Sequence, residues 1–160
     1  MNRIYLALGS NVGDKKKNIQ QAITLLRKKV SNIKIASFYE TKAVGYTEQD
    51  NFINTAIEGN TALTPEELLV FIKDVEKKVG RIKRFLNGPR EIDIDILFYN
   101  NHLLKKDDLQ IPHPRLHERD FVLKPLTDLD PMLYHPICKK TVSELLKDLP
   151  KGTVSIIQNE

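Results

Sequence analysis

The sequence predicts an α+β fold with a ferredoxin-like βαββαβ core, followed by additional short helices and a strand toward the C-terminal end. Two observations lead to this prediction. Segments that alternate apolar and polar residues, typical of half-buried strands, recur before residue 100. Two amphipathic helical segments separate them in the order strand, helix, strand, strand, helix, strand. The length of 160 residues fits about one domain, so we expect residues 1–160 to form a single domain.

The first half of this core is predicted from local patterns. Residues 3–9 alternate and form the first strand. Residues 14–30 place apolar side chains at helical spacing, with Asp14 as the N-cap. Residues 33–40 are again β-like, whereas residues 41–51 show no sustained period and predict a long loop.

The second half begins with alternation over residues 52–59, which ends in a Gly-Asn turn. A helix is predicted from Thr64, because a threonine cap, a proline and a glutamate precede an apolar stripe. A basic loop follows over residues 81–90, and residues 91–99 form the clearest strand. Beyond it we expect short helices and a last strand, around residues 115–123, 142–149 and 153–157.

Composition predicts an ordinary globular protein. Apolar residues make up 41% of the chain and charged residues 29%. No apolar run approaches the ~20 residues that a membrane span needs, and the first residues lack the apolar core of a signal peptide. The single cysteine, Cys138, has no partner for an internal disulfide, which fits a reducing compartment. We therefore expect a cytoplasmic protein without membrane contact.

The charge is unevenly distributed. The formal net charge is +4, and seven basic residues but only two acidic ones lie between Lys73 and Arg90. This stretch directly precedes an acidic strand, so it predicts a local positive field beside carboxylates. Such a field differs from the basic surface of a protein that coats nucleic acid.

The acidic strand is the strongest candidate for chemistry. Alternation places Glu91, Asp93 and Asp95 on one face, with Asp93 and Asp95 roughly 6.6 Å apart along the strand. Unpaired carboxylates at this distance repel each other, and a divalent cation between them removes that cost. Oxygen ligands favour magnesium, calcium or manganese. The alternative is a solvated edge strand whose charges prevent aggregation.

The basic loop supplies groups that bind phosphate. Arg81, Arg84 and Arg90 carry guanidinium groups that bind phosphate oxygens in pairs, and beside a metal they would complete a polyphosphate site. A solvated basic loop is the alternative. His113 and Arg119 are further candidate phosphate contacts. The sequence has no Walker A loop and no Rossmann fingerprint.

A zinc site is not expected. His113 and His117 are four residues apart, but we expect no cysteine or further histidine close enough to complete a site. His102, His117 and His135 are interpreted as ordinary surface or partly buried histidines, and Cys138 as an inert thiol.

The stretch Gly88-Pro89-Arg90-Glu91-Ile92-Asp93-Ile94-Asp95-Ile96-Leu97 resembles the signature of 6-hydroxymethyl-7,8-dihydropterin pyrophosphokinases. Further similar segments cover nearly the whole chain in order. They are Leu6-Ala7-Leu8-Gly9-Ser10-Asn11, Ser37-Phe38-Tyr39-Glu40-Thr41, Asn51-Phe52-Ile53-Asn54, Glu76 with Gly80-Arg81, Pro112-His113, and Arg119-Asp120-Phe121-Val122-Leu123.

The resemblance implies a reaction and its ligands. Members of the family transfer pyrophosphate from ATP to the hydroxymethyl group of a reduced pterin, release AMP, and serve folate biosynthesis. By this likeness Asp93 and Asp95 hold two magnesium ions that bridge the triphosphate, while the pterin oxygen attacks the β-phosphorus. Arg81 and Arg90 become the catalytic residues that neutralise phosphate charge.

The resemblance also assigns binding residues and partners. The ATP-binding residues are Glu76, Arg81, Arg84, Arg90, Ile96, His113 and Arg119. The pterin-binding residues are Phe52 and Phe121, which sandwich the ring, with Asn54, Thr41 and Val44. The implied partners are ATP and the reduced pterin alone, without nucleic acid, and we expect a monomer.

The chain departs from the family at the basic loop. Members commonly have a basic and then an aromatic residue before Gly-Pro-Arg, where this chain has Leu86 and Asn87. The loop over residues 81–87 is also one residue shorter than in some members. Phe85 is the one aromatic residue that could replace the missing anchor, so closure over ATP is the step in question.

The alternative function is a basic, ferredoxin-like nucleic-acid-binding module that uses residues 73–90. Aromatic residues are only 7% of the chain, without tryptophan, and the neighbouring strand presents carboxylates that repel phosphate. Both features favour the enzyme.

Overall fold

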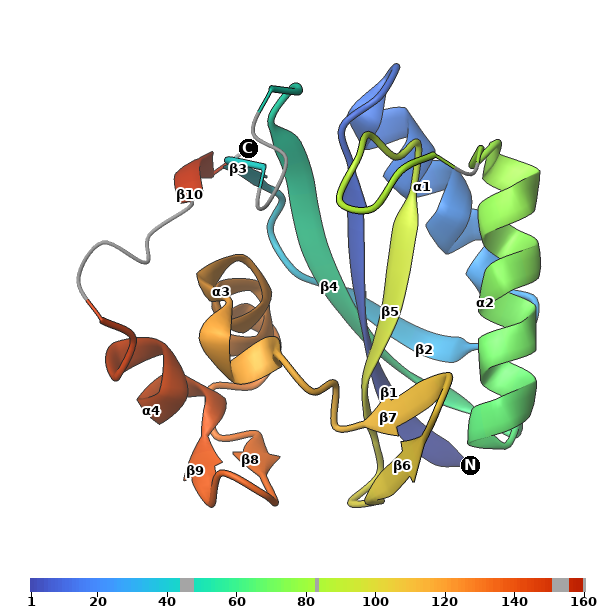
Figure 1. Ribbon diagram of the computed structural model, residues 1–160. Helices are drawn as coiled ribbons and strands as arrows, with labels where there is room; N and C mark the ends of the chain where they lie inside the picture. Colours follow the sequence, from blue (N-terminus) through green and yellow to red (C-terminus); the bar gives the residue numbers. More distant parts are fainter. Residues whose placement is uncertain (44–47, 83, 151–155, 160) are drawn as a thin grey trace.

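The computed structural model describes residues 1–43, 48–82, 84–150 and 156–159. Its centre is an antiparallel sheet in the order β10-β3-β4-β1-β5, with β2 also paired to β4 (Figure 1). The strands are β1 (Asn2–Ser10), β2 (Ser31–Ile35), β3 (Tyr39–Thr41), β4 (Phe52–Thr61), β5 (Asp93–Tyr99) and β10 (Ile156–Asn159). This order confirms the predicted ferredoxin-like core.

Helices cover both faces of the sheet. Helices α1 (Lys15–Leu26) and α2 (Pro65–Val79) lie on one face (Figure 1). On the other face lie the short 3-10 helix η1 (Leu116–Glu118), α3 (Asp120–Leu129) and α4 (Val142–Lys147). Two hairpins, β6–β7 (Leu104–Lys106 and Leu109–Ile111) and β8–β9 (Tyr134–His135 and Lys140–Thr141), complete the described elements.

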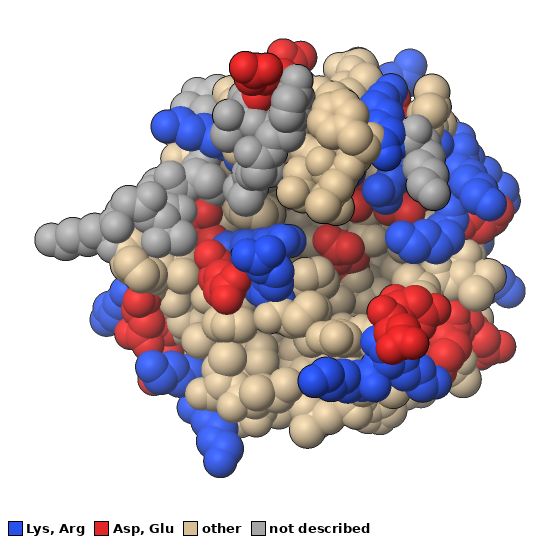
Figure 2. Space-filling view, in the orientation of Figure 1, with Lys and Arg blue, Asp and Glu red and all other residues tan. Residues whose placement is uncertain are grey.

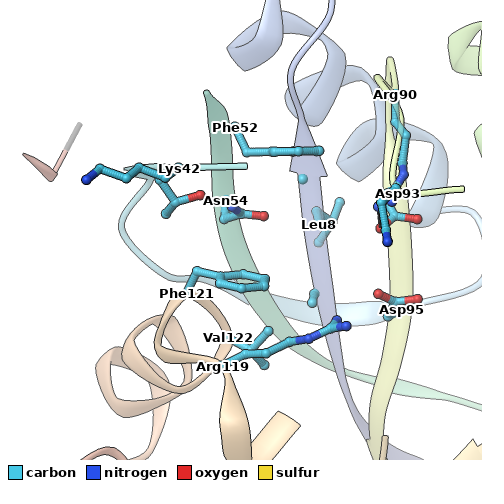
Figure 3. A pocket seen from close by; sticks show the side chains of 14 residues that line it. Leu8, Lys42, Phe52, Asn54, Arg90, Asp93, Asp95, Arg119, Phe121 and Val122 are labelled. Atoms are coloured by element: carbon cyan, nitrogen blue, oxygen red, sulfur yellow. Dashed lines mark hydrogen bonds and ion pairs between the residues drawn. The ribbon is translucent and has the colours of Figure 1, made fainter. Parts of the chain in front are cut away.

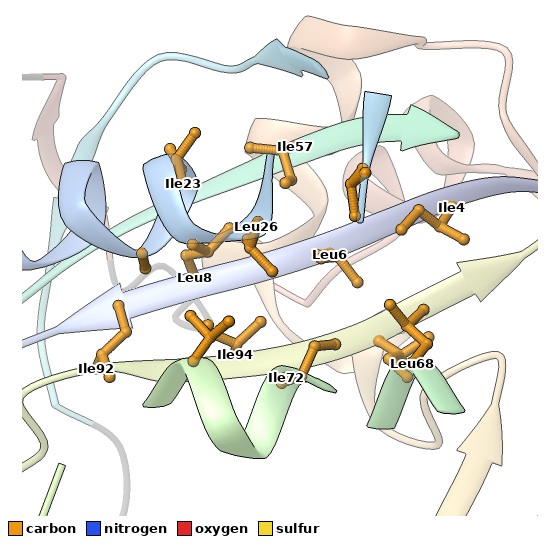
Figure 4. Packing of buried hydrophobic residues seen from close by; sticks show 14 of the residues in the cluster. Ile4, Leu6, Leu8, Ile23, Leu26, Ile57, Leu68, Ile72, Ile92 and Ile94 are labelled. Atoms are coloured by element: carbon orange, nitrogen blue, oxygen red, sulfur yellow. The ribbon is translucent and has the colours of Figure 1, made fainter. Parts of the chain in front are cut away.

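Alternation along β1 divides the apolar core into two layers. Ile4, Leu6 and Leu8 pack against α1 and α2 (Figure 4). Tyr5 faces the opposite layer, where its ring meets the edge of Phe98 at 6.1 Å between centroids. Burial of apolar side chains on both faces stabilises the central strands and keeps their backbone rigid.

The predicted helix starts are confirmed. Asp14 accepts a hydrogen bond from the Lys17 N–H (3.2 Å), and Thr64 and Glu67 form a reciprocal capping box. Helix α2 ends at Gly80, whose φ of +113° suits a residue without Cβ. Helix α1 ends at Leu26, earlier than predicted, and Val30 is buried beyond it.

Strand boundaries differ where pairing decides them. The β-like segment 33–40 is two strands, β2 and β3, which pair with opposite ends of β4. The last core strand begins at Asp93 rather than residue 91, because Arg90 exchanges backbone and side-chain hydrogen bonds with Asn11. The helices expected near residues 115–123 and 142–149 are present, and α3 extends to Leu129. The final strand is Ile156–Asn159, and residues 153–155 lie outside the described residues.

None of the helices in the described ranges combines the length and the apolar character that crossing a membrane requires.

Candidate active site

The candidate site lies on the α3 face of the sheet, where the strand register aligns its residues. Gly9 on β1 is opposite Asn54 on β4 and Asp93 on β5. Ala7 is in the same way opposite Asp95. Because the central strand has the small residues Gly9 and Ala7 at these two positions, space remains between the amide on one side and the carboxylates on the other (Figure 3).

Two hollows meet at these carboxylates. The first is a pocket with Thr41, Phe52, Asn54 and Phe121 in its wall. The second is an open groove along α2 and the basic loop, with Lys73, Glu76, Lys77, Arg84, Phe85, Leu86 and His113 in its wall. Both share the residues Asn87, Arg90, Asp93, Asp95 and Arg119. Figure 2 shows acidic side chains at the bottom of the central hollow with basic side chains around it.

The two aspartates have different surroundings. Asp93 is held by two arginines, with Arg81 Nη1 at 3.2 Å and Arg90 Nη1 at 2.9 Å. Asp95 lies deeper, and burial together with the nearby charge of Asp93 raises its pKa to about 7, although Arg119 opposes this effect. Asp95 is therefore short of positive charge. A cation bound to both carboxylates would supply that charge, and the oxygen donors would suit magnesium.

Glu76 anchors this arrangement from α2. Its buried carboxylate accepts hydrogen bonds from the Ile94 N–H (2.9 Å) and from Arg81 (2.8 Å). Arg81 thus bridges Glu76 and Asp93. Since a buried carboxylate needs such partners, Glu76 fixes both the start of β5 and the position of the Arg81 guanidinium.

Arg84 is engaged within its own loop. Its guanidinium binds both oxygens of Glu91 (2.8 and 2.6 Å) and the Pro89 carbonyl (3.1 Å). This contact lowers the pKa of Glu91 to about 2. Nearby, the Phe85 ring packs so closely on Gly88 that an added Cβ would lie 2.9 Å from it. Leu86 is 88% exposed beside the groove.

Two aromatic rings form opposite walls of the pocket. Phe52 on β4 and Phe121 at the start of α3 face each other across it, with Asn54 between them (Figure 3). A guanidinium group lies over each ring. The Cζ of Arg90 is 5.8 Å from the centre of the Phe52 ring, and the Cζ of Arg119 is 5.7 Å from the centre of the Phe121 ring. A flat ring between the two phenylalanines would therefore reach both arginines at its edge.

Asn54 is held in one orientation. Its Nδ2 donates to the Thr41 hydroxyl at 2.6 Å, so its Oδ1 lies over Gly9. A Cβ at Gly9 would lie 2.5 Å from this oxygen, so the close approach requires glycine. Asn54 thus presents an acceptor to the pocket.

His113 lies in the wall of the groove as a neutral imidazole. Burial lowers its pKa to about 4, and Arg119 adds to the effect. Its Nδ1 accepts a hydrogen bond from the Arg115 N–H (3.2 Å), so its Nε2 carries the proton and is a donor.

The structure brings most of the expected site residues to the two hollows. Ile96 differs, because its side chain is buried in the core against α1 and α2, on the opposite face of β5. Val44 lies outside the described residues. Gly9, Ala7, Lys42 and Asn87 line the pocket without having been predicted to do so. In the sequence, the small residues Ala7 and Gly9 within an apolar strand could have indicated that this strand borders a pocket.

A second group of metal-ligating side chains lies away from this site. Ligand atoms of His117, His135 and Cys138 all fall within 4.8 Å of one another. The expectation that no cysteine or further histidine lies near His117 is therefore wrong. His135 Nδ1, however, accepts hydrogen bonds from the Ile137 and Cys138 N–H groups (3.2 and 3.0 Å). Its Nε2 then carries the ring proton, and the imidazole stabilises the β8–β9 turn.

Comparisons with known proteins point to one family. A profile described as 7,8-dihydro-6-hydroxymethylpterin-pyrophosphokinase (HPPK) matches residues 5–131. The chain is 47% identical over 144 residues to the 2-amino-4-hydroxy-6-hydroxymethyldihydropteridine pyrophosphokinase of Aquifex aeolicus, with 90% of each chain covered. It is 46% identical over 151 residues to the folic acid synthesis protein FOL1 of Dictyostelium discoideum, covering 94% of this chain and 23% of that protein.

A solved structure supports the fold. The Plasmodium falciparum HPPK-DHPS matches with a TM-score of 0.72 and 19% identity, covering 92% of this chain and 43% of that one. The chain thus spans less than half of this relative and about a quarter of the Dictyostelium protein. The nucleic-acid-binding alternative is not favoured by these matches.

Proposed function

The chain belongs to the 7,8-dihydro-6-hydroxymethylpterin-pyrophosphokinase family, and we propose that residues 1–160 act as one pyrophosphokinase domain. In the proposed reaction, pyrophosphate passes from ATP to the hydroxymethyl group of 6-hydroxymethyl-7,8-dihydropterin in folate synthesis. The hydroxyl oxygen forms a bond to the β-phosphorus, and the bond from that phosphorus to the oxygen of AMP breaks. AMP is the leaving group.

The main support is the pair of hollows that share Asp93, Asp95, Arg90 and Arg119. A transfer between two substrates requires two adjacent binding places with the charge-neutralising groups at their junction. The pocket has aromatic walls and a fixed amide, which suit a flat heterocycle. The groove has a basic wall, which suits a triphosphate.

In the pocket, we assign the pterin to the space between Phe52 and Phe121. Offset stacking against two rings contributes about 0.5–1.5 kcal/mol each beyond area burial. Asn54 Oδ1 accepts a hydrogen bond from an N–H group at the edge of the ring, and Thr41 keeps the amide in that orientation. Val44 is retained as a pterin contact from the family resemblance.

In the groove, Arg81 and Arg90 act on the phosphates. Both hold Asp93 in the structure, and we assign them a change of partner, from the carboxylate to phosphate oxygens, when the nucleotide binds. Arg84 joins them once it leaves Glu91. Arg119 and the Nε2–H of His113 supply further donors. Glu76 keeps Arg81 aligned, and Ile96 contributes to ATP binding only through its place in β5.

Asp93 and Asp95 are the proposed ligands of two magnesium ions. The donor atoms fit, because both carboxylates reach the junction of the hollows and Asp95 lacks balancing charge. When bound, magnesium neutralises the triphosphate and stabilises the attacking and leaving oxygens. A monomer remains the expected state. The cytoplasm remains the expected compartment.

The direct test measures AMP release from ATP with and without the pterin, in magnesium and in EDTA. We expect AMP only when both pterin and magnesium are present. Asp95→Asn should abolish it, and Glu66→Gln, which removes an exposed carboxylate paired with Lys106, should not. AMP release that ignores the pterin, or full activity of Asp95→Asn, would contradict the proposal.

A further inference from the structure

The helix that carries Phe121 is hydrogen-bonded to the short strand β3. Tyr39, the first residue of β3, is buried, and its hydroxyl donates a hydrogen bond to Asp128 Oδ2 on α3 at 2.6 Å. Asp128 lies seven residues after Phe121, so two helical turns separate them and both side chains leave the same side of α3. The Tyr39 hydrogen bond therefore links β3 to the side of α3 on which Phe121 stands.

A second link joins β3 to the first turn of α3. The Ile156 N–H donates a hydrogen bond to Asp120 Oδ2 at 3.3 Å, and Asp120 is buried. Ile156 begins β10, which pairs with all three residues of β3 (Figure 1). Strand β3 is thus connected to α3 on both sides of Phe121 in the sequence, through β10 before it and through Tyr39 after it.

The same strand is also connected to the opposite wall of the pocket. In the pairing of β3 with β4, Thr41 is opposite Phe52 and Tyr39 is opposite Asn54. The Thr41 hydroxyl also accepts the hydrogen bond from Asn54 Nδ2. Because β3 is bound to β4 on one side and to α3 on the other, its position decides how far apart the rings of Phe52 and Phe121 lie (Figure 3).

The chemistry of Tyr39 makes its link to α3 specific. Burial and the neighbouring Asp128 carboxylate raise the pKa of Tyr39 to about 12, so the phenol remains a donor at neutral pH. A hydrogen bond to an ionised acceptor is stronger than one between neutral groups. Phenylalanine at this position would fill the same space without a donor, so the hydrogen bond and the packing are separable by substitution.

We propose that Tyr39 is a positioning residue that sets the width of the gap between the Phe52 and Phe121 rings, and with it the selectivity of the pocket for a flat ring. The inference rests on the proposed function, which assigns the pterin to this gap. Tyr39 is not among the described residues that line the two hollows, so it acts through Asp128 and α3. A gap of fixed width lets a flat ring stack on both phenylalanines, whereas a puckered ring fits less closely.

The test uses the whole chain. Tyr39→Phe removes the donor, Asp128→Ala removes the acceptor, and Asp128→Asn keeps an oxygen that accepts. Asp128 is exposed, so its variants test the same hydrogen bond even where Tyr39→Phe fails to fold. The matched control is Tyr99→Phe, which removes another buried phenol, one that donates to the Leu63 carbonyl in the core layer against α1 and α2.

Calorimetry with a non-hydrolysable ATP analogue and magnesium present measures two Kd values. One is that of 6-hydroxymethyl-7,8-dihydropterin, and the other is that of its tetrahydro analogue, whose reduced ring is puckered. The Kd of the ATP analogue is measured separately without a pterin. The ratio of the two pterin Kd values reports the preference for the flat ring, which a general loss of stability would not change.

We expect the wild type to prefer the dihydropterin. Tyr39→Phe and Asp128→Ala should each raise the Kd of the dihydropterin about three- to tenfold, the worth of one hydrogen bond, and reduce the preference by a similar factor. The double variant should be no weaker than either single variant, because both remove the same contact. Asp128→Asn should keep most of the preference, and the Kd of the ATP analogue should not change.

Three results would overturn the inference: no preference in the wild type, an unchanged preference in Tyr39→Phe and Asp128→Ala, or an equal loss of preference in Tyr99→Phe. The last result would assign the effect to core stability rather than to the link between β3 and α3. The proposed function fails separately, because the wild type would then bind no dihydropterin and release no AMP in its presence.

Discussion

Asp95→Asn should stabilise the fold while abolishing activity. The wild-type carboxyl is partly buried beside Asp93, and its pKa of about 7 lies above the ordinary 3.8. An amide has nearly the same shape and no charge to bury. The substitution therefore removes a cost that the folded chain bears whenever Asp95 is ionised.

The sign and size of the effect follow from proton linkage. Between the two pKa values, the folded chain holds a proton on Asp95 that the unfolded chain releases, so the free energy of unfolding falls as pH rises. The slope is about 1.4 kcal/mol per pH unit and ends near pH 7. From about pH 5.5 to about pH 8, the stability of Asp95→Asn relative to the wild type should increase by about 2 kcal/mol.

Urea unfolding of both proteins in EDTA at the two pH values measures this difference, because other titrating groups are common to both. Magnesium added at the higher pH should raise the midpoint of the wild type and leave that of Asp95→Asn unchanged. A difference that stays flat with pH would refute the assigned burial of Asp95. Equal stabilisation of both proteins by magnesium would refute its role as a ligand.

Three further substitutions test other parts of the site. Gly9→Ala places a Cβ 2.5 Å from Asn54 Oδ1. Such overpacking costs about 1–3 kcal/mol, so the Kd of the pterin should rise about tenfold. The Kd of the nucleotide should not change, and calorimetry measures both. Arg90→Lys keeps the charge but loses the planar group over Phe52, so kcat should fall about tenfold at unchanged stability; wild-type kcat would contradict this. Thr64→Ala breaks the α2 capping box and should cost about 1 kcal/mol in urea unfolding, with AMP release unaffected.

Local chain properties made much of the fold predictable. The strand period of two placed Asp93 and Asp95 on one face, and the structure has both at the same pocket. The capping box at Thr64 fixed the start of α2 within one residue. These features depend on neighbours in sequence, so a single chain reveals them.

Features set by distant contacts were not predictable. The segment over residues 33–40 divides into two strands because β4 pairs with each part separately. His117 and Cys138 meet only because η1 and the β8–β9 hairpin fold back together. Gln49 gave no signal, since its side chain donates a hydrogen bond to the carbonyl of Asn87, 38 residues away. For Ile96 the local pattern was the better guide. Alternation along the strand directs its side chain to the face opposite Asp95, in the core, whereas the family resemblance had assigned it to ATP binding.

The strand register around Gly9 fixes the distance between the two ends of the site. Neighbouring strands lie about 4.8 Å apart, so Asn54 on β4 and Asp93 on β5 are held roughly 10 Å apart by backbone hydrogen bonds. Side-chain substitutions alter how tightly each end binds, but they leave this span unchanged. Under the proposed function, the acceptor is therefore selected by its length as well as by its ring. An analogue with a longer or shorter arm would carry its hydroxyl past or short of the phosphorus, however well the ring stacks, and a misplacement of ~1 Å costs about 100-fold in rate.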